Sequence, residues 1–205
     1  MTEPVFFYDF SSPYSYLSAH RVDDVLPIRP RWRPILFGAL IGAIGKEPWS
    51  LREGPPRDAQ MRECEERAAA LGLPLRWPRD WPTGTYSILA GRAALVADEH
   101  GRLREFSQAA FKQGLGYGRD LTDLDVVLEA ATEAGLDAGA VARGVELPEI
   151  KERLRELTDT ARELGVTGVP TVIIDNELFW GDDRLEDAAR VLEARGATSM
   201  SDAGS

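Results

Sequence analysis

The feature that most constrains the fold is a short apolar run that ends in two hydroxyl residues and a proline. Val5–Tyr8 predicts a buried strand, and Ser11 and Ser12 stand directly before Pro13. Ser12 suits the N-cap position of a helix and Pro13 its first turn, and we expect this helix to end before Pro27. The junction therefore places a hydroxyl at the positive end of a helix, where anions and thiolates are stabilised.

The predicted order of elements is β-α-β, then a block of helices, then α-β-β-α. Small residues in the segment 38–45 indicate a loop or a helical turn. The remaining elements outside the block are a strand over Arg31–Leu36, a helix over Pro148–Leu164, hairpin strands over Thr171–Ile174 and Leu178–Trp180, and a last helix to about Arg195. Pro34 suggests that the strand after the first helix lies at an edge of the sheet or has an irregular end.

Without the helical block this order is the thioredoxin arrangement, so the chain predicts an α/β, thioredoxin-like fold with a large all-helical insertion. We expect the thioredoxin-like domain to be discontinuous, because its two halves must meet to build one sheet. The expected divisions are residues 1–37 and 148–195 for this domain, 38–147 for the insertion, and 196–205 for a disordered tail.

Composition limits the classes of function. The 205 residues are 43% hydrophobic and 28% charged, and the net charge of −10 argues against binding to nucleic acid or anionic membranes. The amino terminus has no signal-peptide pattern and no segment is long and apolar enough to span a membrane, so we expect a cytoplasmic protein. Cys64 is the single cysteine, and His20 and His100 show no metal-ligand spacing, so we expect no metal site.

The Ser12–Ser15 segment stands where redox proteins of this fold carry Cys-x-x-Cys. A hydroxyl cannot cycle between thiol and disulfide, but it can donate a hydrogen bond to a thiolate and so lower the pKa of that thiol. Glutathione is the natural source of such a thiolate, which makes Ser12 the candidate catalytic residue. The alternative is that Ser12 only caps the helix.

A second segment, Gly165–Thr171, precedes the predicted hairpin. Only about 5% of X–Pro bonds in folded proteins are cis, but in the thioredoxin layout this loop faces the start of the first helix. We therefore expect a cis bond between Val169 and Pro170 that turns the Val169 N–H and C=O outward, where they can pair with the cysteinyl part of an extended peptide. The alternative is an ordinary loop proline.

The start of the last helix offers groups for a zwitterionic ligand. Its backbone N–H groups suit a carboxylate, and the side chains of Asp182 and Asp183 suit an ammonium. The γ-glutamyl end of glutathione carries both groups. The alternatives are simple capping by Asp182 and a surface ion pair for Arg184.

Aromatic side chains are candidates for a substrate pocket. The candidates are Tyr14, Phe37, Trp81 and Tyr86. The alternative for the tryptophans Trp49, Trp77 and Trp81 is that they anchor proline-rich loops.

Three motifs together carry a family resemblance: Tyr8–Leu17, Gly168–Thr171 and Phe179–Leu185. They resemble the 2-hydroxychromene-2-carboxylate isomerase and kappa-class glutathione transferase family, and the helical block, including Leu36–Leu40, fits it too. The resemblance implies a DsbA-like thioredoxin fold, a homodimer, glutathione as cofactor, and action of Ser12 on its thiol.

The implied activity is glutathione-dependent cis–trans isomerisation of an aromatic catabolite, by reversible addition of the thiolate to a conjugated double bond. A kappa-like transferase or peroxidase and a non-catalytic peptide- or thiol-binding module are the alternatives. Two positions differ from the family's pattern: Lys46 stands where asparagine is common and can reach a ligand carboxylate, and Asp182 adds negative charge where an anion docks. These differences leave a thiol other than glutathione as an alternative.

Overall fold

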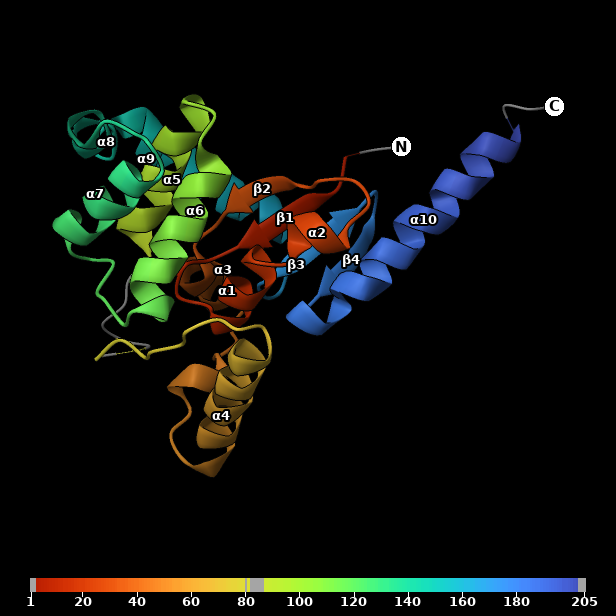
Figure 1. The fold of residues 1–205 in the computed structure, drawn as a ribbon, viewed down its shortest axis with the longest axis horizontal. Helices are drawn as coiled ribbons and strands as arrows, with labels where there is room; N and C mark the ends of the chain where they lie inside the picture. The colour runs from red at the N-terminus through yellow and green to blue at the C-terminus, as the bar shows by residue number, and fades with distance from the viewer. Residues whose placement is uncertain (1–2, 80, 82–86, 203–205) are drawn as a thin grey trace.

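The computed structural model describes the chain except for residues 1–2, 80, 82–86 and 203–205 (Figure 1). Its centre is a four-stranded mixed sheet in the order β2-β1-β3-β4. The strands are β1 (Val5–Tyr8), β2 (Arg31–Pro34), β3 (Thr171–Ile174) and β4 (Glu177–Trp180). β1 pairs parallel with β2 and antiparallel with β3, and β3 pairs antiparallel with β4. The predicted thioredoxin-like arrangement is therefore confirmed, and Pro34 does lie on an edge strand.

Helices cover the sheet and fill the sequence between its two halves. Before and just after β2 these are α1 (Pro13–Ala19), α2 (Val22–Val25), α3 (Phe37–Ala43), η1 (Trp49–Leu51) and α4 (Pro55–Ala70). The others are α5 (Ile88–Glu99), α6 (Leu103–Phe111), η2 (Lys112–Gly116), α7 (Leu124–Glu133), α8 (Ala138–Gly144), α9 (Pro148–Glu163), η3 (Asp182–Arg184) and α10 (Leu185–Asp202). None of the helices in the described part of the chain is long and apolar enough to cross a membrane.

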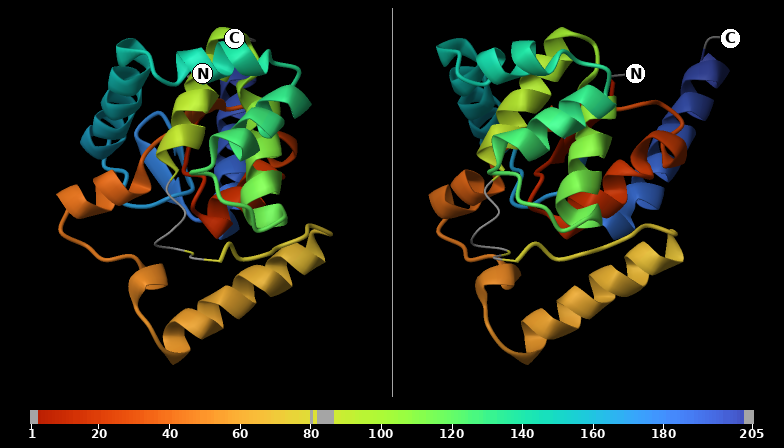
Figure 2. Two further views of the ribbon diagram at one scale, coloured as in Figure 1. Left: turned by 90° about the vertical axis from the view of Figure 1, so that its left-hand side faces the viewer. Right: turned by 60° about the vertical axis from the view of Figure 1, so that its left-hand side comes forward.

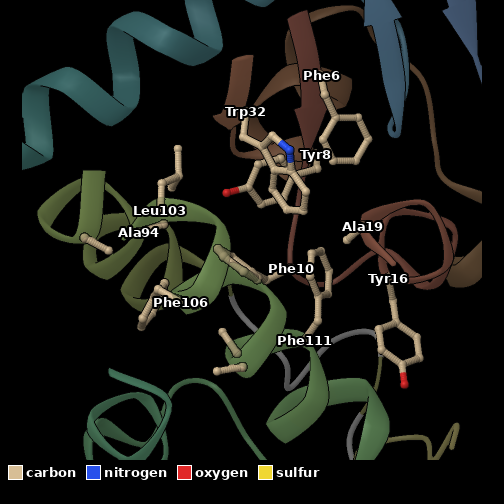
Figure 3. Close-up of a cluster of buried hydrophobic side chains, with 14 of the residues drawn as sticks. Phe6, Tyr8, Phe10, Tyr16, Ala19, Trp32, Ala94, Leu103, Phe106 and Phe111 are labelled. Atoms are coloured by element: carbon tan, nitrogen blue, oxygen red, sulfur yellow. The ribbon is translucent and has the colours of Figure 1, made fainter. Parts of the chain in front are cut away.

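Aromatic side chains join the sheet to the helices of the insertion (Figure 3). Phe6 and Tyr8 stack with ring centroids 5.4 Å apart, and Trp32 meets Phe6 edge-on at 5.1 Å. Tyr8 also shares a buried 2.6 Å hydrogen bond with Ser107 Oγ on α6, which satisfies both hydroxyls. The opposite face of the sheet carries a smaller buried cluster with residues from α3 and α9.

One predicted boundary before β2 was wrong. The single helix expected between Pro13 and Pro27 is divided into α1 and α2, because the amides of His20 and Arg21 bond to carbonyls three residues back and end α1 early. Of the two alternatives for the segment 38–45, a loop or a helical turn, the structure shows the helical one, because most of the segment lies in α3.

The last helix also differs from the prediction. α10 continues to Asp202 instead of ending near Arg195, so the tail expected to be disordered from residue 196 is helical as far as the structure describes it. Small and polar residues are compatible with a helix that is already formed. Residues 203–205 lie outside the described part.

Helix α4 stands apart from the other helices, at the lower edge of the molecule in all three ribbon views (Figures 1 and 2). Only Cys64 and Ala68 of this helix are buried. Much of its attachment is polar: Arg57 donates to the Trp81 carbonyl, and the Trp77 indole donates to Glu65. The helix therefore meets the rest of the protein through a few named contacts, and these bear on the site described below.

Candidate active site

Ser12 is the N-cap of α1, as predicted. Its Oγ accepts a 3.1 Å hydrogen bond from the Ser15 amide, and Pro13 occupies the first turn. The only acceptor near the Ser12 hydroxyl in the described residues is the Val169 carbonyl, at 3.5 Å. That distance is longer than an ordinary O–H···O hydrogen bond. The capping bond uses a lone pair of Ser12, so its hydroxyl hydrogen stays available to a ligand.

Asp9 organises the loop that presents this hydroxyl. Its Oδ1 accepts from the amide and hydroxyl of Ser11, both at 2.7 Å. Its Oδ2 accepts from the Phe37 amide at 2.7 Å and from Ser87 Oγ at 2.9 Å. Asp9 is buried, and hydrogen bonds to an ionised carboxylate are stronger than those between neutral groups. The carboxylate thus ties the loop before α1 to the starts of α3 and α5.

The Val169–Pro170 peptide bond is cis, which confirms the prediction for this bond. The loop follows α9 and leads into β3, which pairs with β1, the strand that leads to Ser12. Val169 lines the same cavity as Ser12, whereas Pro170 is buried and does not appear in its wall. Ser12 and Val169 therefore line one space.

That space is a cavity of about 370 Å³, within the range of small-molecule sites. Its wall is formed by the loop before α1, the start of α3, η1, one side of α4, the loop before β3 and the turn after β4. The lining residues of this wall include Ser11, Ser12, Tyr14, Phe37, Trp49, Gln60, Glu63, Arg67, Trp81, Val169, Trp180, Asp182 and Asp183. The cavity thus combines apolar surface with a few charged groups.

Most aromatic residues of this wall are packed against one another. Tyr14, Trp49 and Trp81 form a continuous series with ring centroids 6.2 and 5.6 Å apart. Trp81 is buried, and its indole N–H donates to the Ser11 carbonyl at 3.0 Å. Trp81 is thus both a wall residue and an anchor of the loop before Ser12. Trp77 contacts Trp81 with its ring tilted at 48° and the centroids 4.5 Å apart, but Trp77 does not line the cavity.

Trp180 differs from these residues because its side chain is 61% exposed. Its indole lies on Gly168, where a Cβ atom would be 2.2 Å from the indole nitrogen. The prediction of site residues missed Trp180. An outward-facing tryptophan at the end of an edge strand, next to Gly181, is the signal that could have found it.

Asp182 lines the cavity, but its carboxylate is already engaged. The residue is 1% exposed, and it accepts from Ser18 Oγ at 2.9 Å, from Arg21 at 3.4 Å and from Arg67. These partners come from α1, the turn after α1 and α4, so Asp182 joins α4 to the thioredoxin-like part. Asp183, by contrast, is exposed at the cavity wall.

The structure does not bring every predicted residue to the site. Lys46 is exposed after α3 and is not part of the cavity wall. Tyr86 lies outside the described residues. Arg67 was not predicted, and it is a cation that lines the cavity. Its sequence context is a polar helix 55 positions after Ser12, and only the tertiary contact with Asp182 reveals its place.

The thiol of Cys64 is poorly suited to act as a nucleophile. The residue is fully buried, and burial raises the pKa of its thiol to about 12, although the hydrogen bond with Tyr14 works in the opposite direction. Burial likewise raises the pKa of Tyr14, so its hydroxyl stays protonated near neutral pH. Among the described residues no group of three or more His, Cys, Asp or Glu is arranged to hold a metal ion.

The fold and the site define a thioredoxin-type protein with a serine at the N-cap of its first helix. Residues 5–193 match the family described as DSBA-like thioredoxin domain, and the chain belongs to that family. It is 31% identical to 2-hydroxychromene-2-carboxylate isomerase of Sphingobium xenophagum over 191 residues, which cover 91% of this chain and 96% of the relative.

Two further comparisons agree. Glutathione S-transferase kappa 1 of Homo sapiens is 25% identical over 203 residues, covering 91% of this chain and 88% of the human protein. A solved structure of 2-hydroxychromene-2-carboxylate isomerase superposes with a TM-score of 0.82 at 23% identity, covering all of both chains, and supports the fold. The chain is thus related to isomerases and glutathione transferases.

Proposed function

We propose that this protein is a glutathione-dependent isomerase of an aromatic catabolite, similar to 2-hydroxychromene-2-carboxylate isomerase. The observation that carries the proposal is the Ser12 hydroxyl, which caps α1 through its lone pair and whose Oγ lies 3.5 Å from the Val169 carbonyl oxygen, its acceptor in the described residues. When bound, glutathione supplies the thiolate whose reversible addition to a conjugated double bond permits rotation about that bond.

The residues present fit a peptide thiol. The cavity volume of about 370 Å³ is suited to a small ligand, and its wall includes Ser12, Val169 and several charged residues. Ser12 would donate its hydrogen to the thiolate, which favours the charged form and lowers the pKa of the thiol. Val169 would pair with the cysteinyl backbone. Asp183 would contact the amino-acid end of the ligand.

Holding the reactive groups is the second task of this site. Asp9 accepts hydrogen bonds from the loop before α1 and from the start of α3, so it holds Ser12 and Phe37 at a fixed distance from each other. Tyr14, Phe37 and Trp81 supply apolar surface for an aromatic substrate. Fixing reactants in this way removes much of the entropic part of a barrier.

A transferase or peroxidase of the kappa class would use the same thiolate, and the human relative supports this second candidate. A product assay separates the two: an isomerase leaves the amount of reduced glutathione unchanged, whereas a transferase consumes it. A non-catalytic binding module is the third candidate. For such a module, replacing Ser12 would only weaken binding, because there is no chemical turnover to abolish.

The direct test incubates the protein with 2-hydroxychromene-2-carboxylate and reduced glutathione and follows the isomer ratio. We expect turnover that requires glutathione and falls by at least about a hundredfold in Ser12→Ala, since the variant loses the donor to the thiolate. Ser15→Ala is the matched control, because it removes a neighbouring hydroxyl that is buried and outside the cavity wall. Turnover that survives in Ser12→Ala would refute the assigned role.

A further inference from the structure

A second cavity, of about 670 Å³, lies at the β2 edge of the sheet, where β2 packs against α5 and α9 (Figure 1). We call it the β2 cavity. Among the described residues it shares none of its lining with the candidate active site. Its wall is rich in arginine and includes Arg29, Arg31, Arg33, Arg104 and Arg153. The chain as a whole has a net charge of −10, so this gathering of cations is a local feature.

Carboxylates also line the β2 cavity, but each of those in the described part of the chain has an arginine as its ion-pair partner. The pairs are Glu3 with Arg31 at 3.3 Å, Asp23 with Arg104 at 3.1 Å, Glu105 with Arg102 at 3.2 Å, and Asp98 with Arg153. A paired carboxylate repels an incoming anion less than a free one does, because the nearby cation compensates its charge.

Arg33 is the cation of this wall with the weakest compensation. Its Nη1 lies 4.0 Å from Asp98 Oδ2, an oxygen that already accepts from Arg153, and its side chain is 21% exposed. Within the described residues its guanidinium makes no hydrogen bond. Burial lowers the pKa of Arg33, and the charges of Arg31 and Arg153 lower it further. A bound anion would relieve this repulsion.

Neighbouring arginines are held in place and keep donors free. Arg104 donates to the Pro30 carbonyl at 2.6 Å, and Arg153 donates to Asp98. A guanidinium has five N–H donors, so these bonds use only part of each group. Arg29 is exposed and has no carboxylate partner in the part of the chain that the structure describes. The wall therefore has more cationic donors than the protein's own acceptors use.

The chemistry of this wall favours a phosphate group. A planar guanidinium presents parallel N–H donors that match phosphate oxygens, and a tetrahedral phosphate can accept from several directions at once. Arg33, Arg104 and Arg153 approach the cavity from β2, α6 and α9. The volume leaves room for an organic group attached to the phosphate. The net charge of −10 disfavours a long polyanion, so the ligand class is a small molecule.

We propose that the β2 cavity binds the phosphate group of a small phosphorylated molecule, with Arg33 and Arg153 as donors to its oxygens. The site is separate from the cavity that contains Ser12, so it does not depend on the proposed function and can be tested without it.

The test is calorimetry with inorganic phosphate and with methyl phosphate, the smallest monoester, at constant low ionic strength. We expect saturable binding of both, and affinity at least about tenfold weaker in Arg33→Gln, because a hydrogen bond to a charged group is lost. Arg155→Gln is the matched control, since Arg155 is 68% exposed on α9 and lies outside the wall of the β2 cavity. This variant should bind like the wild type.

A second readout needs no variant: either phosphate should raise the Tm of the wild type above its value in sodium chloride of equal ionic strength. Absence of saturable binding, or equal weakening by Arg33→Gln and Arg155→Gln, would overturn the inference. Binding of inorganic phosphate without methyl phosphate would overturn the assignment to a phosphorylated molecule and leave a site for the free ion.

Discussion

Replacing Asp182 with asparagine should destabilise the protein, because it removes the charge that joins three segments. The carboxylate accepts from Ser18, Arg21 and Arg67, and it is 1% exposed. Removing one partner of a buried ion pair costs about 3–5 kcal/mol. The two arginine side chains are 20% and 27% exposed, and asparagine keeps one acceptor, so solvent reduces the loss. We expect about 2–3 kcal/mol.

The assay is reversible urea unfolding, with thermal unfolding alongside. For a chain of this size the loss corresponds to a fall in Tm of about 4–12 °C. The double variant Asp182→Asn with Arg67→Gln should be less destabilised than the sum of the single variants, since each removes the same interaction. If Asp182→Asn lowers the free energy of unfolding by less than about 0.5 kcal/mol, and the effects of the two single variants add, the claim that Asp182 joins these three segments is refuted.

Three further predictions concern residues around the site. Asp9→Asn should lower the free energy of unfolding by about 2–3 kcal/mol, because the amides of Ser11 and Phe37 lose charged acceptors; an unchanged urea midpoint would contradict this. Native Cys64 should react far more slowly with a thiol reagent at pH 8 than the unfolded chain does, since burial raises its pKa to about 12; equal rates would exclude a buried thiol. Gly168→Ala should displace the Trp180 indole, because the new Cβ would lie 2.2 Å from the indole nitrogen. Tryptophan emission should therefore shift relative to wild type, and an identical spectrum would argue against this packing.

Local chemistry made the thioredoxin-like part of the fold predictable. Serine is common at the N-cap of a helix and proline in its first turn, and α1 begins at Ser12 and Pro13 as this pattern predicts. The hairpin strands also follow from short segments, whereas the cis bond before Pro170 was expected from the place of its loop in the thioredoxin layout. The end of α1 was missed, because the division between α1 and α2 depends on how His20 and Arg21 pack and bond.

The composition of the cavity wall was less predictable. Arg67 reaches Asp182 across 115 positions of sequence, and no local pattern in a polar helix indicates that contact. Asp9 was visible in the motif, but its four hydrogen bonds come from Ser11, Phe37 and Ser87, which only the folded chain brings together. Side chains whose roles depend on distant segments need the structure for their interpretation.

The most direct measurement of the central claim is a pH titration of glutathione bound to the wild-type protein and to Ser12→Ala, following the ultraviolet absorbance of the thiolate. The account predicts that the bound thiol has a pKa below that of free glutathione in the wild type, and that Ser12→Ala binds glutathione without this shift. An equal thiol pKa in both proteins would contradict the claim that the Ser12 hydroxyl stabilises a thiolate.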